Sequence, residues 1–167
     1  MTTISATAIF CEDIREEAGG SFTLIGVLPD VINIAPPPGP QEQMAAAQSQ
    51  RPPRRMLSKL CIFTRVSFDP AREFSSVNVR LTMPNGMSRE LGEVPRATIE
   101  EARQFAKSEG HSTASVLVRH AFNDFKVGRP GEMKVEVLID GAFMTAGALH
   151  FRQAPARPEL VASPSVH

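Results

Sequence analysis

The chain has 167 residues, of which 42% are hydrophobic and 22% charged, values typical of one soluble globular domain with a buried core. Its 18 basic and 18 acidic residues cancel, which argues against general binding to nucleic acid or to an anionic membrane surface. No apolar run approaches the roughly 20 residues of a membrane-spanning helix and no signal peptide is recognisable, so we expect a cytoplasmic protein without membrane contact.

Two runs rich in β-forming residues open the chain. The first spans 4–15 and the second 21–28, and Gly19-Gly20 between them favours a turn. We therefore predict an N-terminal β-hairpin. Pro29-Asp30 interrupts the second run, after which residues 31–34 could resume it as a short extended piece.

Residues 35–55 have a different composition, beginning with PPPGP and ending with RPPRR. Prolines remove backbone amide donors and therefore exclude regular sheet. We predict a long Pro-rich loop insertion here, and a solvated loop is favoured over a ligand-binding one.

Strand patterns return after this insertion. Apolar and polar residues alternate over 56–68 and over 77–83, and Pro84-Asn85-Gly86 predicts a turn into a partner strand at 87–91.

One short helix is predicted over 98–109, as a crossover or a lid on a sheet edge. Thr98 and Glu101 have the spacing of a capping box, and Gly110 can end the helix. The predicted apolar face consists of Ile99, Ala102, Phe105 and Ala106.

The last third of the chain again alternates like strands, over 116–122, 133–139 and 143–151. Asp140-Gly141 is a strong signal for a tight hairpin turn. Residues 154–167 show no periodicity, and we expect a flexible C-terminal tail.

Seven or eight short strands with one short helix predict a mainly β protein, an immunoglobulin-like antiparallel β-sandwich in a single domain spanning 1–153. The Cys, Trp and Cys signature of true immunoglobulin domains is absent, because the chain has no tryptophan.

The strings FCEDIREEAGGSFTLIGVLPD, LSKLCIFTRV and PGEMKVEVLIDG together resemble a family of small uncharacterised bacterial proteins, a domain of unknown function. The resemblance covers most of the chain except the Pro-rich insertion and the tail. It implies a β-sandwich and no particular activity.

The FCEDIR segment holds the most suggestive side chains: Cys11, Glu12, Asp13 and Arg15. Cys11 does not fit a nucleophile, because neighbouring carboxylates raise a thiol pKa, so we interpret it as a buried structural residue. A disulfide with Cys61 stays open if their strands are neighbours. Asp13 is expected to accept backbone amides or to pair with Arg15 or with an arginine on a neighbouring strand.

Histidines raise the possibility of a metal site. His120 and His150 could meet if their strands are neighbours, and Cys11 with Asp13 could join them. No H-x-H or C-x-x-C pair supports this, and a lone strand histidine is more often structural.

We therefore predict a non-catalytic β-sandwich that acts through protein–protein interaction, as a subunit, adaptor or scaffold, without a cofactor or metal. The expected partner is another protein or a second copy in a homodimer. The candidate interaction or structural-signature residues are Cys11, Glu12, Asp13, Arg15 and His120. The alternative is a small-ligand or metal-binding module that uses the Cys11–Arg15 segment.

Overall fold

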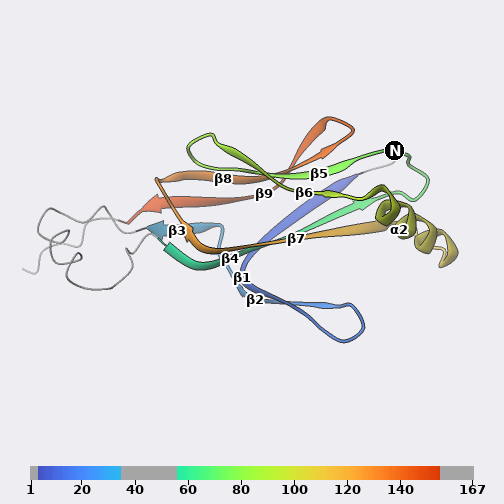
Figure 1. Ribbon diagram of the computed structural model, residues 1–167, viewed down its shortest axis with the longest axis horizontal. Helices are drawn as coiled ribbons and strands as arrows, with labels where there is room; N and C mark the ends of the chain where they lie inside the picture. The colour runs from blue at the N-terminus through green and yellow to red at the C-terminus, as the bar shows by residue number, and fades with distance from the viewer. Residues whose placement is uncertain (1–3, 35–55, 155–167) are drawn as a thin grey trace, which may run out of the picture.

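A computed structural model describes residues 4–34 and 56–154 and shows two β-sheets packed face to face (Figure 1). Sheet A has the strand order β2-β1-β4-β7, formed by Phe22–Val27, Ser5–Glu16, Met56–Phe68 and Ala114–Lys126. Sheet B has the order β3-β9-β8-β5-β6, formed by Val31–Ile34, Ala142–Gln153, Gly131–Ile139, Val77–Thr82 and Ser88–Val94. The predicted mainly β sandwich is confirmed, while its immunoglobulin-like type stays a prediction. The insertion at 35–55 and nearly all of the predicted tail lie outside the described residues.

The described residues form nine strands rather than seven or eight, because 31–34 makes a strand of its own. The chain passes from β2 in sheet A to β3 in sheet B at Pro29-Asp30, where the Asp30 carbonyl accepts the His150 amide at 2.8 Å. Strand β3 then pairs in parallel with β9, so the sandwich is not wholly antiparallel. Proline lacks an amide donor and could not have extended the β2 ladder.

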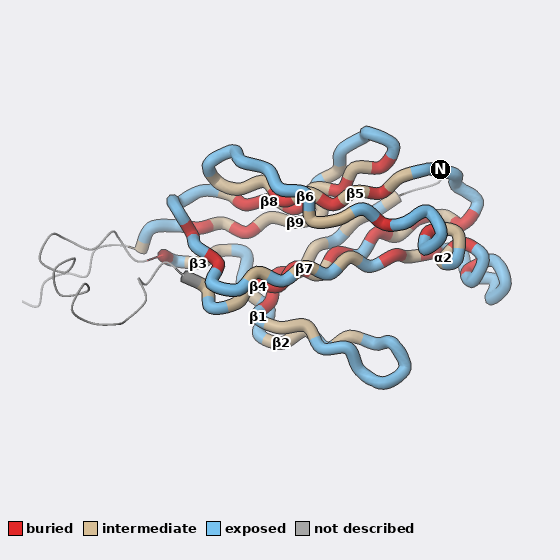
Figure 2. The backbone as a smooth tube through the Cα atoms, in the orientation of Figure 1, coloured by how far each residue is buried: buried red, intermediate tan, exposed pale blue. Residues whose placement is uncertain are grey.

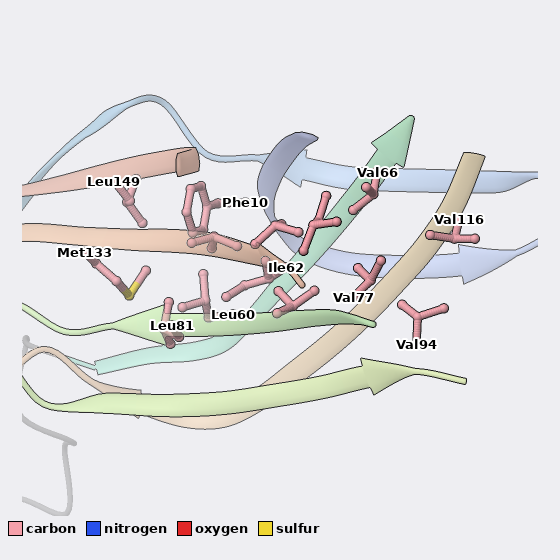
Figure 3. Packing of buried hydrophobic residues seen from close by; sticks show 14 of the residues in the cluster. Phe10, Leu60, Ile62, Val66, Val77, Leu81, Val94, Val116, Met133 and Leu149 are labelled. Carbon is pink, nitrogen blue, oxygen red and sulfur yellow. The ribbon is translucent and has the colours of Figure 1, made fainter. Parts of the chain in front are cut away.

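The core lies between the sheets and follows the strand alternation, as the buried positions in Figure 2 show. In Figure 3, Phe10, Leu60 and Ile62 from sheet A lie against residues of sheet B. The sheet B residues of this cluster include Val77, Leu81, Met133 and Leu149. Fully burying such a side chain contributes about 1.5–3 kcal/mol, so this interior is the main source of stability.

The two sheets approach closely where β9 passes β1. A Cβ atom on Gly147 would lie 2.8 Å from the Ala8 carbonyl oxygen and 3.2 Å from the Ala8 Cβ. Only glycine fits this contact without a shift of backbone. The small residues at this crossing therefore fix the distance between β1 and sheet B.

Helix α2 spans Arg96–Ser108 and connects β6 of sheet B to β7 of sheet A, which confirms the predicted crossover. The predicted capping box is wrong. Pro95 stands at the N-cap without a side-chain hydrogen bond, so the helix begins before Thr98, and Thr98 lies in its first turn. Proline fixes φ at a helix-compatible value (here −57°), which favours the earlier start.

The apolar face predicted for α2 also includes one residue, Phe105, that does not face the core. Ile99 and Ala106 are buried, but Phe105 is 63% exposed and packs edge-on against His111. Six residues separate Phe105 from Ile99, which places them about 120° apart around the helix. Gly110 follows the helix with φ +68°, a conformation that glycine adopts easily, as expected for a helix end.

The predicted Asp140-Gly141 turn joins β8 to β9, with positive φ at both residues. The Asp140 carboxylate accepts hydrogen bonds from the Ser75 and Ser76 amides at 2.9 and 3.0 Å. These bonds hold the pKa of Asp140 below its ordinary value. The turn therefore also anchors the segment that leads into β5.

Thr64 is a polar residue on the core-facing side of β4. It is fully buried, and its hydroxyl has no hydrogen-bond partner in the part of the chain that the structure describes. We expect Thr64→Val to raise the free energy of unfolding by about 1 kcal/mol, because it replaces an unsatisfied hydroxyl with a methyl group of similar size. Urea denaturation followed by circular dichroism measures this change.

The matched control is Val66→Thr, two residues further along the same buried face. It introduces the hydroxyl that the first variant removes, and should lower the free energy of unfolding by about 1–3 kcal/mol. A destabilised Thr64→Val variant would show that the Thr64 hydroxyl is satisfied in solution.

Candidate functional site

Strand β1 changes partner at Cys11, and this places the candidate residues. It pairs with β4 from Ser5 to Cys11 and with β2 from Cys11 to Glu16. Beyond Cys11 the β1–β2 hairpin leaves the sandwich and projects from its body (Figure 1). The hairpin residues beyond Cys11 therefore lie beside β4 without pairing with it.

A small hollow of about 280 Å³ lies at the base of this hairpin, and we refer to it as the root hollow. Its lining residues come from β1, β4 and β7: Asp13, Ile14, Lys59, Cys61, Arg119, His120 and Ala121. The structure thus brings Asp13, Cys61 and His120 to the border of one site, together with four residues that the sequence did not single out.

Asp13 forms an ion pair with Lys59 of β4, and its other carboxylate oxygen lies 3.6 Å from Arg15 Nε. The expected partner on a neighbouring strand is thus present, but it is a lysine rather than an arginine. The hydrogen bond from Lys59 lowers the pKa of Asp13, and the same contact raises the pKa of Lys59. Both side chains remain partly exposed, so the pair orients the hairpin base more than it stabilises the fold.

Cys11 and Cys61 face away from the core and are nevertheless buried. Each alternates along its strand with core residues such as Phe10 and Ile62, yet they are 0% and 1% exposed. Burial raises the pKa of Cys11 to about 11 and also raises that of Cys61. Such thiols are protonated at neutral pH, which agrees with a structural role for Cys11. Burial raises the pKa of Cys11 more than the neighbouring carboxylate of Asp13 does.

Glu12 and Arg15 do not line the root hollow. Glu12 is exposed and lies over Gly26 of β2, where a Cβ atom would be 2.6 Å from the Glu12 carboxylate. Arg15 points toward solvent with its side chain 66% exposed. Of the four candidate residues in the FCEDIR segment, Asp13 contributes to the hollow directly and Cys11 lies beside it, opposite Cys61.

His120 borders the hollow, but its ring belongs to a different environment. The imidazole packs on Phe122 with ring centroids 4.5 Å apart, and burial together with nearby Arg89 of β6 lowers its pKa. His150 lies in sheet B, with Nε2 3.8 Å from Glu132. The proposed meeting of His120 and His150 is therefore wrong, and no group of three or more potential metal ligands occurs among the described residues.

Arg119 of β7 fastens the hairpin arm onto the outer face of sheet A. It donates to Glu16 Oε2 at 2.9 Å, and its guanidinium carbon lies 4.6 Å from the centre of the Phe22 ring. Phe22 in turn contacts Phe63 of β4, with centroids 5.7 Å apart. Sequence reasoning missed this clasp because its members are distant along the chain and meet only after the hairpin bends.

A larger cleft of about 560 Å³ lies between α2 and the segment before β5. Its charged lining residues are Glu73, Arg96, Glu100, Arg103, Lys107 and Asp140. Arg103 is buried, pairs with Glu100 and donates to the Arg72 carbonyl at 2.7 Å. The charges largely compensate one another. We therefore interpret this cleft as the polar contact between α2 and the segment before β5. The charged residues at 96, 100, 103 and 107 share one helix face, a spacing that could have revealed it.

The Asp13–Lys59 pair predicts a pH dependence of stability. A lowered carboxylate pKa in the folded state stabilises the protein above the ordinary value of 3.8, and this contribution is lost as the pH falls through the lowered pKa. We expect Asp13→Asn to lower the thermal unfolding midpoint at pH 7, and the difference from wild type to vanish once the pH has fallen below the lowered pKa of Asp13. Differential scanning calorimetry from pH 7 downward measures it.

Glu93→Gln provides the control, because Glu93 is an exposed carboxylate without an ion pair in the described part of the chain. Its midpoint should follow wild type at every pH. If Asp13→Asn also follows wild type at every pH, the ion pair contributes nothing in solution.

No family model matches the chain, and no curated protein matches it. The resemblance to the uncharacterised bacterial family therefore stays a prediction. Among the described residues, no helix has the length and apolar character needed to cross a membrane. What the protein does must be argued from the geometry of its own strands and side chains.

Proposed function

We propose that this chain is a non-catalytic interaction module that binds a second copy of itself through strand β7. The observation that carries this proposal is the edge of sheet A. Strand β7 has 13 residues, pairs with β4 from Ala114 to Lys126, and pairs with no other strand among the described residues.

An unpaired strand edge presents a row of amide and carbonyl groups that can pair with another strand. Two copies of β7 related by a two-fold axis would meet antiparallel, so that each offers the same edge to the other. Four of its residues are exposed on one face of the sheet: Leu117, Arg119, Ala121 and Asn123. Of these, Arg119 already contacts Glu16 and Phe22 within the chain. Leu117 is the exposed apolar residue among them, at 42%.

The absence of a reactive arrangement in the described residues supports a non-catalytic role. The buried thiols have raised pKa values, and the His120 ring packs on Phe122 rather than against Asp13. A general base must reach the proton that it removes, and a nucleophile needs a base beside it. We further propose a cytoplasmic location, where thiols are kept reduced.

The test is the oligomeric state of the full chain by size-exclusion chromatography with light scattering. Wild type should have twice the 18.2 kDa mass of one chain. Leu117→Lys combined with Ala121→Lys should give the monomer, because like charges would face each other across the strand pair. A wild-type monomer at every concentration tested would exclude this dimer.

The control combines Thr7→Lys with Thr145→Lys. Both residues are exposed, but they lie on β1 and β9, which are interior strands of their sheets. This variant adds the same charge and should remain dimeric. If it also dissociates, the dimer interface lies elsewhere or depends on net charge.

A second candidate function is the binding of a small anion in the root hollow. The favouring observation is that Lys59 and Arg119 border a hollow that contains only one carboxylate, Asp13, in its lining. Its volume of about 280 Å³ is near the lower end for ligand sites. Sodium acetate or sodium phosphate should raise the unfolding midpoint above that in sodium chloride of equal ionic strength. Lys59→Gln should abolish the effect, and an equal midpoint in all salts would leave this function without support.

A further inference from the structure

We propose that Cys11 and Cys61 form a redox-responsive modification site, a reversible disulfide that fastens the base of the β1–β2 hairpin to β4. In the structure both thiols are free. The proposal concerns what an oxidant does to them and does not depend on dimerisation through β7.

The register of the sheet carries the proposal. Cys11 and Cys61 are direct partners across antiparallel strands, and theirs is the last pair in the β1–β4 ladder. Directly opposed residues have Cα atoms about 4.5–5.5 Å apart, within the range of about 4.4–6.8 Å that a disulfide requires. Opposed side chains also lie on the same sheet face, so neither strand needs to rotate.

The position of the Cys61 sulfur agrees with this geometry. Its Sγ atom lies 3.6 Å from the carbonyl oxygen of Glu12, the residue that follows Cys11. The thiol of β4 therefore already reaches the backbone of β1 beside its partner. Burial of both side chains keeps the pair away from bulk solvent and from other protein thiols.

The root hollow supplies a route for a small oxidant, because Cys61 is one of its lining residues. Lys59 lies in the same lining and acts on both thiols to lower their pKa, against the larger effect of burial. Oxidation is therefore expected to be slow and to begin at Cys61, which is the sulfur that an entering peroxide meets first.

The reaction with hydrogen peroxide balances in two steps. The Cys61 thiolate attacks one peroxide oxygen, the O–O bond breaks, and a sulfenic acid and one water form. The proton that Cys61 gave up goes into the first water. The Cys11 sulfur then attacks the Cys61 sulfur, the S–O bond breaks, and the sulfenic OH leaves as the second water with the Cys11 proton. Two thiols are oxidised to one disulfide while one peroxide is reduced to two waters, and a dithiol such as dithiothreitol reverses the change.

The bond would have a structural consequence, because it closes a loop of 51 residues, from Cys11 to Cys61 inclusive. That loop contains β2, β3 and the segment 35–55. A cross-link across such a loop restricts the unfolded chain, so the oxidised protein should unfold several degrees higher than the reduced one. It would also prevent the hairpin base from separating from β4.

The experiment uses the full chain, reduced and then treated with hydrogen peroxide under native conditions. Excess N-ethylmaleimide in denaturant then labels any remaining thiols, and intact-mass spectrometry reads the result. We expect a species lighter by about 2 Da that carries no label, together with a raised unfolding midpoint that dithiothreitol reverses. Unoxidised protein should carry two labels.

Cys11→Ala and Cys61→Ala are matched controls, each with one thiol. Neither can lose two hydrogens within one chain, and peroxide should not raise the unfolding midpoint of either. A wild type that gains only oxygen, that forms only cross-linked dimers, or that stays doubly labelled would overturn the proposal. If the lighter species forms only in denaturant, the folded sheet does not position the pair, which would overturn it equally.

Discussion

Strand β1 contacts three other strands along its length, and the arrangement of the two sheets and the hairpin depends on these contacts. Its first half pairs with β4 and packs against β9 of the other sheet, where Ala8 leaves no room for a side chain at Gly147. Its second half pairs with β2. Beyond Cys11, β1 no longer pairs with β4 and has β2 as its one strand partner among the described residues. The hairpin projects from the sandwich for this reason.

Part of the outward-facing surface of sheet A is buried where the hairpin leaves the sheet. Residues that alternate with the core would normally meet solvent, yet Cys11 and Cys61 are covered at the hairpin base. The Arg119 contacts with Glu16 and Phe22 hold the arm against the sheet further along. A charged and aromatic clasp on one side and the Asp13–Lys59 pair on the other thus enclose the root hollow between them.

Much of the fold follows from local patterns in the sequence. Strict alternation predicted β5 and β8, and Asp140-Gly141 predicted the turn after β8, because each depends on neighbours within a few residues. The start of α2 did not follow, since the Thr98 pattern competed with Pro95, and the proline set the boundary. The parallel pairing of β3 with β9 and the Arg119 clasp depend on residues more than 90 positions apart, which no local pattern encodes.

For the candidate site, too, the sequence predicted the local segment but not its contacts with distant strands. Sequence alone identified the FCEDIR segment and separated a structural Cys11 from a pairing Asp13, but it could not place their partners on the neighbouring strands. Glu12 and Arg15 face solvent, Asp13 binds Lys59, and Cys11 meets Cys61. A segment in which one strand exchanges partners must carry residues for several distinct contacts within a few positions. Dense, chemically varied side chains in a short stretch can therefore mark a branch point in a sheet, and in this chain that explanation accounts for the contacts of the FCEDIR segment.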